Sequence, residues 1–186
     1  MVKRFCLVLG ILVFMIPLLS ITLSIILSPW FSFFKNALSD LGHSTQSNVA
    51  PLFNLGLCSG GILLIIFGGV CVSSITNNKV IGLILALSGY FLTLIAVFDE
   101  IYGRLHYIIS LLFFLSLALG TLTYAYTYKS FKALSMLFIG TAIWVLYFMK
   151  IIKCGIAIPE LVSILVVLVW YIDLLREITK EVKKAS

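Results

Sequence analysis

Histidine and carboxylate side chains gather in two short segments of this chain. Asp40 and His43 follow one apolar run, while Asp99, Glu100 and His106 surround the turn between two others. Histidine and carboxylate groups are ligands of divalent metal ions, and a bound metal can activate water. We therefore interpret His43, Asp99 and His106 as candidate metal ligands. Asp40 and Glu100 are the candidate catalytic residues, acting as general bases against a lipid ester or amide.

Each of these groups also has a structural interpretation. Asp40 can bond the backbone of its own turn. Asp99, Glu100 and Arg104 can form a solvated ion-pair cluster that contributes little energy. His106 can donate a hydrogen bond to a neighbouring loop. No segment has the H-E-x-x-H, H-x-E or C-x-x-C spacing of a well-defined metal site, so the outcome depends on the elements that carry these residues.

The composition indicates that these elements lie in a membrane. Of the 186 residues, 62% are hydrophobic and 11% are charged, whereas soluble domains carry roughly 25% charged residues. A soluble domain of this length leaves too much surface in water to bury so many apolar side chains. The sequence therefore predicts one integral membrane domain over residues 1–186, with no separate soluble domain.

Six apolar runs are long enough for spanning helices, which need about 20 mostly apolar residues. The first run follows Lys3 and Arg4, but its apolar core exceeds that of a signal peptide, so we expect it to be retained. We predict an all-α, polytopic bundle of six transmembrane helices, with a short interfacial helix over Pro29–Leu41 after the first span. The spans are expected at residues 5–27, 49–73, 80–98, 105–126, 133–149 and 159–175.

Lysine and arginine are distributed unequally between the two sides of such a bundle. Nine of the thirteen fall on the side of the termini and four on the other. Since cytoplasmic loops carry the excess of basic residues, we predict a multi-pass protein of the cell membrane with both termini in the cytoplasm. His43 and His106 then share the outer face. The four basic residues expected there are Lys35, Arg104, Lys150 and Lys153.

Small residues and cysteines within the runs predict packing rather than chemistry. Gly56 and Gly60 form a G-x-x-x-G pair, whose spacing lets helix backbones approach closely. None of the four cysteines forms a C-x-x-C pair, and three lie in apolar runs, so we expect neither a disulfide framework nor a zinc site. Glu160, at the start of the last run, is interpreted as a carboxylate that stabilises the first turn of a helix.

The net charge of +6 does not indicate a nucleic-acid-binding protein. The basic residues flank apolar runs instead of clustering in one folded module, and the densest group, from Arg176 to Lys184, follows the last run. That group is expected to determine topology, or alternatively to contact anionic lipid headgroups. The predicted partners are membrane lipids.

Three short motifs resemble a known family. They are Leu38-Ser39-Asp40-Leu41-Gly42 after the first run, Leu52-Phe53-Asn54 early in the second, and the acidic turn before His106. In these the chain resembles the domain of unknown function 998 family, uncharacterised prokaryotic membrane proteins with six helices. Where family members often carry a proline beside the acidic turn, this chain has Phe98-Asp99-Glu100. The resemblance implies a membrane bundle and no established activity.

Three functions are compatible with these patterns. The first is a non-enzymatic integral membrane protein that interacts with lipid or acts as a scaffold or sensor; the apolar helices and the lack of a strong motif favour it. The alternative is a membrane-embedded, metal-dependent hydrolase or transferase with its site on the outer face, for which a divalent metal would be the cofactor. A transporter is less favoured, because the spans hold few charged residues.

Overall fold

The structure, a computed structural model, describes residues 2–76 and 78–184. Within them, six helices are long and apolar enough to cross a membrane, which confirms the predicted all-α architecture. A π-helical turn, η2 (Phe67–Val72), and the short α3 (Ser73–Ile75) extend the second of these helices. The spanning helices are α1 (Val2–Ile26), α2 (Ala50–Ile66), α4 (Lys79–Val97), α5 (Arg104–Thr127), α6 (Phe131–Phe148) and α7 (Ala157–Lys184).

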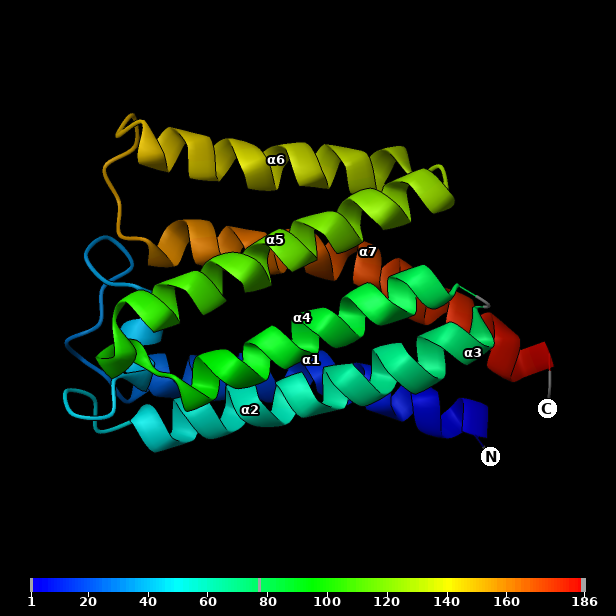
Figure 1. Cartoon of the computed structure of the whole chain (residues 1–186), viewed down its shortest axis with the longest axis horizontal. Helices are drawn as coiled ribbons and strands as arrows, with labels where there is room; N and C mark the ends of the chain where they lie inside the picture. Colours follow the sequence, from blue (N-terminus) through cyan, green and yellow to red (C-terminus); the bar gives the residue numbers. More distant parts are fainter. Residues whose placement is uncertain (1, 77, 185–186) are drawn as a thin grey trace.

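The helices form a bundle in which the start of α1 and the end of α7 lie at the same end (Figure 1). We call this the terminal end, and the opposite end, which bears the long first loop, the loop end. Helix α1 packs on α2 and α7, α4 packs on α2 and α5, and α6 packs on α5 and α7 at the edge of the bundle. At the terminal end, Lys3 Nζ lies 3.7 Å from Glu181 Oε2, which brings the start of α1 beside the end of α7.

Short connections place the polar residues at the helix ends. The Asn78 side chain accepts a hydrogen bond from Ile81 N at the start of α4, and Ser130 does the same for Ala133 N in α6. Both are N-caps, which satisfy helix N–H groups that have no intrahelical partner. At the loop end, η3 (Glu100–Tyr102) joins α4 to α5 through Gly103, whose φ of 51° is readily adopted only by glycine.

The first loop differs in detail from the prediction. A short helix does follow the first span, but it is the 3₁₀ helix η1 (Leu38–Gly42), and turns instead of helix precede it from Pro29. The Asp40 carboxylate accepts a hydrogen bond from Ala37 N at 3.1 Å, which holds the start of η1. Leu38 and Leu41 are buried, so η1 packs on the bundle through its leucines.

The last helix is longer than its predicted span of residues 159–175. It continues to Lys184, and charged side chains three residues apart pair along it: Asp173 with Arg176 at 2.8 Å and Glu177 with Lys180 at 2.7 Å. Pairs at this spacing lie on one helix face and support the helix in water. The helix therefore extends nine residues beyond the predicted end of the span, to Lys184.

The sequence did not indicate a disulfide framework, yet the structure contains a disulfide bond. Cys6 in α1 and Cys71 in η2 are joined by a disulfide bond. The two residues are 65 positions apart and belong to no short motif, so their pairing depends on how α1 packs against the π-helical turn. Both cysteines are buried.

The predicted close approach at the G-x-x-x-G pair is present between α1 and α2. A Cβ atom added at Gly60 would lie 2.1 Å from Pro17 Cγ, and one at Gly56 would lie 2.1 Å from Ser20 Oγ. Ser20 Oγ donates to Leu52 O at 2.6 Å across the same contact. In lipid, helices associate through such close packing and interhelical hydrogen bonds, because apolar burial alone gives no net driving force.

Candidate functional site

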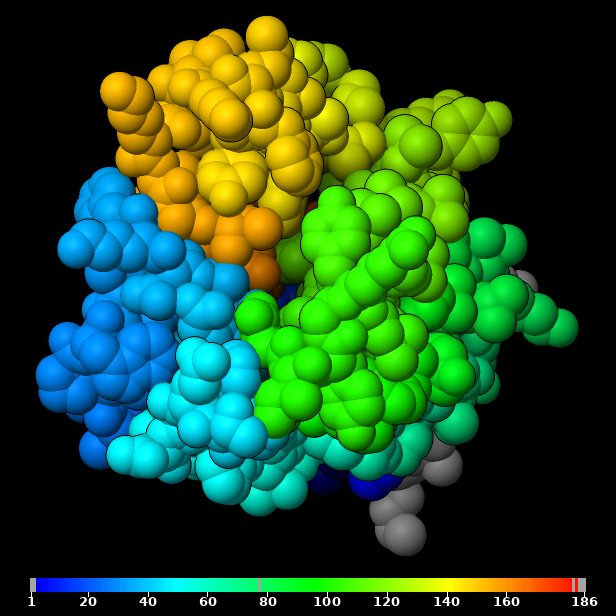
Figure 2. Space-filling view, turned by 60° about the vertical axis from the view of Figure 1, so that its left-hand side comes forward, coloured from blue at the N-terminus to red at the C-terminus, as the bar shows by residue number. Residues whose placement is uncertain are grey.

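The loop end contains a hollow between three segments that are far apart in the sequence. Figure 2 shows it between the first loop in blue and cyan, the green segment around η3, and the orange segment before α7. The first loop is held against the start of α7, where Ala157 N donates to Asn36 O at 3.0 Å. It is held on α2 as well, where Asn54 Nδ2 donates to Gly42 O at 2.9 Å. These backbone anchors position η1 above the bundle interior.

Glu160 joins α7 to η1. It lies in the first turn of α7, as the sequence predicted, but its Oε2 accepts a hydrogen bond from Leu38 N of η1 at 2.7 Å. The first N–H groups of any helix lack an internal partner, and here a side chain from a distant helix supplies one. Glu160 is only 9% exposed. It therefore brings a buried carboxyl group against η1.

A second chain of polar contacts joins η1, η3 and α5. Ser39 Oγ donates to Glu100 Oε1 at 2.5 Å, and the same oxygen lies 3.8 Å from His106 Nε2. His106 Nδ1 is 2.7 Å from Phe98 O. Because a carbonyl oxygen only accepts, Nδ1 carries a proton and donates it. The imidazole of His106 is thereby fixed with Nε2 directed towards Glu100.

The hydroxyl of Ser110 contacts the same imidazole from one turn along α5. Ser110 Oγ lies 3.4 Å from His106 Nε2. When the imidazole is neutral, Nε2 has no proton and accepts from this hydroxyl. Other serine and threonine hydroxyls in the spans, such as those of Ser88 and Thr121, donate to the carbonyl four residues earlier. The hydroxyl of Ser110 is directed towards a side chain instead.

Asp99 connects η3 to the first loop. Its Oδ1 accepts from Ile101 N at 3.0 Å, and its Oδ2 accepts from Ser44 N at 3.2 Å. Burial raises the pKa of Asp99, but hydrogen bonds from the Ser44 side chain and from the Ile101 and Ser44 backbones, with attraction from His43, outweigh it and hold this pKa below its usual value. The charged form of Asp99 therefore stabilises the fold.

This depressed pKa predicts an acid-sensitive contribution to stability. The contribution is present above the unfolded pKa of about 3.9 and is lost as the pH falls through the lower folded pKa. We expect Asp99→Asn to lower the free energy of unfolding at neutral pH by about 1–2 kcal/mol and to flatten its pH dependence below about pH 4. The measurement is a melting curve of purified protein in detergent between pH 2.5 and 7.

The control is Glu177→Gln, which removes an exposed ion pair with Lys180 and should change the stability little. Equal stability of D99N and the parent protein at pH 7 would contradict the assignment.

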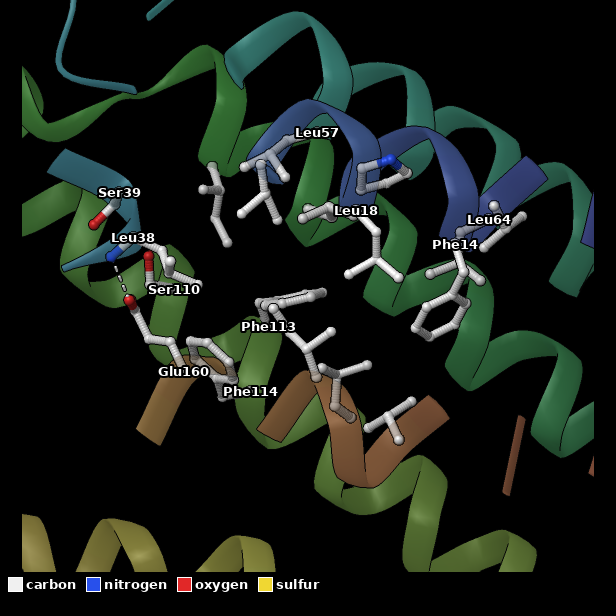
Figure 3. Close-up of a pocket in the computed structure, with 18 of the residues that line it drawn as sticks. Phe14, Leu18, Leu38, Ser39, Leu57, Leu64, Ser110, Phe113, Phe114 and Glu160 are labelled. Atoms are coloured by element: carbon white, nitrogen blue, oxygen red, sulfur yellow. Dashed lines mark hydrogen bonds between the residues drawn. The ribbon is translucent and has the colours of Figure 1, made fainter. Parts of the chain in front are cut away.

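Two cavities inside the bundle meet at Glu160. The first, of about 110 Å³, runs between α1, α2, α4, α5 and α7, and the second, of about 310 Å³, lies between α5, α6 and α7. Ser110 and Glu160 line both. Figure 3 shows that Ser39, Ser110 and Glu160 lie at one end of the first cavity, while Phe113, Leu18 and Leu64 continue away from them. The first cavity is therefore apolar along its length and polar at one end.

The structure brings the predicted site residues together in pairs and not as one group. Glu100 Oε1 lies 3.8 Å from His106 Nε2. His43 attracts the Asp99 carboxylate electrostatically, and the His43 ring nitrogen Nδ1 lies 3.4 Å from Thr45 Oγ1. Asp40 Oδ2 accepts from Asn36 and Ala37, the structural interpretation given above. Across residues 2–76 and 78–184, no three histidine, cysteine, aspartate or glutamate side chains are arranged to hold a metal ion. Metal binding by His43, Asp99 and His106, and catalysis by Asp40 or Glu100, stay predictions.

Sequence reasoning missed the groups that line the cavity. Glu160 was interpreted only as a stabiliser of its own helix, and Ser110 was not singled out. Ser110 lies four residues after His106, and this spacing places both on one face of a helix. That spacing is the signal by which Ser110 could have been found. The contact of Glu160 with η1 had no such signal, because 122 residues separate Glu160 from Leu38.

Comparison with known proteins gives a family and no activity. Neither the curated proteins nor the solved structures contain a match to this chain. A family model described as "Protein of unknown function (DUF998)" matches residues 8–176. This range includes η1, the acidic turn, His106 and Glu160, so the site described above lies within the shared region. The chain belongs to the DUF998 family of proteins of unknown function.

Proposed function

We propose that this protein binds a membrane lipid by taking its hydrocarbon chain into the first cavity. The observation that carries the proposal is the lining of this cavity, which is apolar along its length and polar only where Ser39, Ser110 and Glu160 line it. Ligand pockets are commonly apolar with a few polar groups that orient the ligand. A single-chain amphiphile matches this pattern, with its head at Glu160 and its chain along Leu18 and Phe113.

The second cavity supports the proposal by offering a route from the bilayer. It adjoins the first at Glu160 and Ser110 and lies beside α6, the least buried of the spanning helices. Its volume of about 310 Å³ reaches the lower end of the range of about 300–1,000 Å³ for ligand pockets. A lipid that enters between α6 and its neighbours reaches the polar end of the first cavity directly.

We further propose that the loop end faces outward from the cell membrane. The basis is the excess of lysine and arginine on the side of the termini, nine against four. In this orientation the head of the bound lipid lies near the outer surface of the bilayer. Labelling of single cysteines introduced in the Trp30 segment and near the end of α7, on intact cells, tests the orientation: only the first should react with a reagent that does not cross the membrane.

No specific observation favours the metal-dependent hydrolase or the transporter. The hydrolase would need a set of metal ligands, and the described residues hold no such group. A transporter would be favoured by a polar cavity at mid-membrane depth, whereas both cavities are lined mainly by apolar side chains. Lipid binding without chemistry is the function that the geometry supports best.

Filling the first cavity should displace the lipid. We expect Leu18→Trp to reduce the lipid that copurifies with the protein about tenfold, because overpacking an apolar site costs about 1–3 kcal/mol. The matched control is Leu19→Trp, since Leu19 is 53% exposed on the outside of the same helix and does not line the cavity. Native mass spectrometry of both variants counts the lipids bound per protein. Equal occupancy in the two variants would overturn the proposal.

A further inference from the structure

One oxygen of the Glu160 carboxyl group has no hydrogen-bond partner among the described residues. Oε2 accepts from Leu38 N at 2.7 Å, and this is the one hydrogen bond that the described residues make to the carboxyl group. Glu160 is nine-tenths buried and lines both cavities. A buried carboxylate is costly unless it is paired and hydrogen-bonded. Its free oxygen therefore calls for a donor, and a ligand in the cavity is placed to supply it.

The electrostatic surroundings of Glu160 are negative. Asp40 and Glu100 both act on it as like charges. No lysine or arginine of the described chain lines either cavity, and the basic residues of the loop end, Lys35, Arg104, Lys150 and Lys153, are exposed. A phosphate or carboxylate head at this position would be repelled, whereas a cation would be attracted.

Each of the two hydroxyls at the polar end has lone pairs that can accept. Ser39 donates its proton to Glu100 Oε1, and Ser110 Oγ lies 3.4 Å from His106 Nε2. Each oxygen keeps lone pairs with which to accept a further hydrogen bond. Together with the Glu160 carboxyl group, which as a carboxylate accepts at both oxygens, they form the polar end of the cavity. An alkylammonium head has three N–H donors and no acceptor, and so complements this set.

We propose that the cavity is selective for a long-chain amine: its protonated amino head pairs with Glu160 Oε1 and its alkyl chain occupies the first cavity. This inference rests on the proposed lipid binding and names the class of lipid. The ammonium head neutralises the buried carboxylate and donates to the Ser39 and Ser110 hydroxyls. An alcohol of the same length can donate one hydrogen bond but brings no charge, and a fatty acid brings a charge of the wrong sign.

The test compares three probes that have the same alkyl chain: dodecylamine, 1-dodecanol and dodecanoate. Each probe is titrated against the purified full-length protein at pH 7, and native mass spectrometry measures how much of it binds. We expect dodecylamine to bind about 10- to 100-fold more tightly than 1-dodecanol, as a charge-assisted hydrogen bond provides, and dodecanoate to bind most weakly. Glu160→Gln should remove the preference, so that dodecylamine and 1-dodecanol bind the variant with similar affinity. The glutamine carbonyl can still accept from Leu38 N, and retained dodecanol binding shows that the variant is folded. Glu177→Gln, at the exposed part of α7, is the control for charge alone.

The outcomes separate the two proposals. If none of the probes binds the parent protein, or if Leu18→Trp leaves their binding unaffected, the proposed lipid binding fails and this inference fails with it. If the probes bind in the cavity but dodecanoate or 1-dodecanol equals dodecylamine, only the inference about the head fails. If E160Q retains the preference for the amine, the inference about the head likewise fails and the proposed lipid binding stands.

Discussion

Gly68→Ala is expected to lower the free energy of unfolding by about 3 kcal/mol, the upper end of the usual cost of overpacking. A Cβ atom at Gly68 would lie 2.5 Å from Gly82 O and 2.7 Å from Ala86 N. Both contacts are to the backbone of α4, so no side chain can rotate away to make room. The methyl group would force η2 and α4 apart along a contact where the two backbones now touch. SDS titration of the protein in mixed micelles, followed by circular dichroism, measures the effect.

The neighbouring glycine provides the matched control. A Cβ atom at Gly69 would meet no other atom within 4 Å. Gly69→Ala should therefore leave stability unchanged or raise it by up to about 1 kcal/mol, since alanine is favoured over glycine in a helix. If the two variants unfold at the same SDS fraction, the close contact between η2 and α4 does not exist as described. A loss in G69A alone would be evidence for a different register of the π-helical turn.

Trp170→Ala is expected to destabilise the bundle by about 3–5 kcal/mol, the range for removing a large buried aromatic ring. Trp170 is fully buried in α7, and its ring centroid lies 4.9 Å from that of Tyr124 in α5. Its Nε1 donates to Thr121 Oγ1 at 2.9 Å. Truncation leaves a void between α5 and α7 and removes both contacts. The measurement is the same SDS titration followed by far-ultraviolet circular dichroism, which does not depend on the removed fluorophore.

Two further variants separate the packing of Trp170 from its hydrogen bond. Thr121→Val removes the acceptor and keeps the shape, so it should cost about 0.6 kcal/mol, the average for a hydrogen bond between membrane helices. Trp30→Ala removes a tryptophan that is 48% exposed in the first loop and should have little effect. If T121V were as damaging as W170A, the hydrogen bond and not the ring would hold α5 to α7. If W30A matched W170A, burial would not explain the loss.

Cavity occupancy and stability are separable in this molecule. The glycine contacts and Trp170 lie along helix interfaces, whereas Leu18, Ser110 and Glu160 line open space between helices. Variants at the helix interfaces should reduce the yield of folded protein. Variants at the cavity lining should change the lipid that the folded protein carries. This division makes the binding experiments interpretable, because a cavity variant that still binds one probe is folded.

The sequence by itself predicted a membrane protein built of six apolar helices. Six apolar runs predicted six spanning helices, and the residues of η1, the acidic turn and His106 indicated the family. These properties are readable because the length and hydropathy of a segment are local, and because a helix satisfies its own backbone within the segment. Even the G-x-x-x-G contact of Gly60 follows from spacing within one helix.

Only the tertiary structure decided which distant side chains meet. The disulfide of Cys6 with Cys71, the bond from Leu38 N to Glu160 and the contact of Ser39 with Glu100 each join segments at least 61 residues apart. No local pattern encodes them, because they depend on the order and rotation of packed helices. The cavities arise in the same way, from the spaces left where helices remote in sequence do not fill the bundle interior. The chemistry inferred for Glu160 therefore comes from its neighbours and not from its position in the sequence.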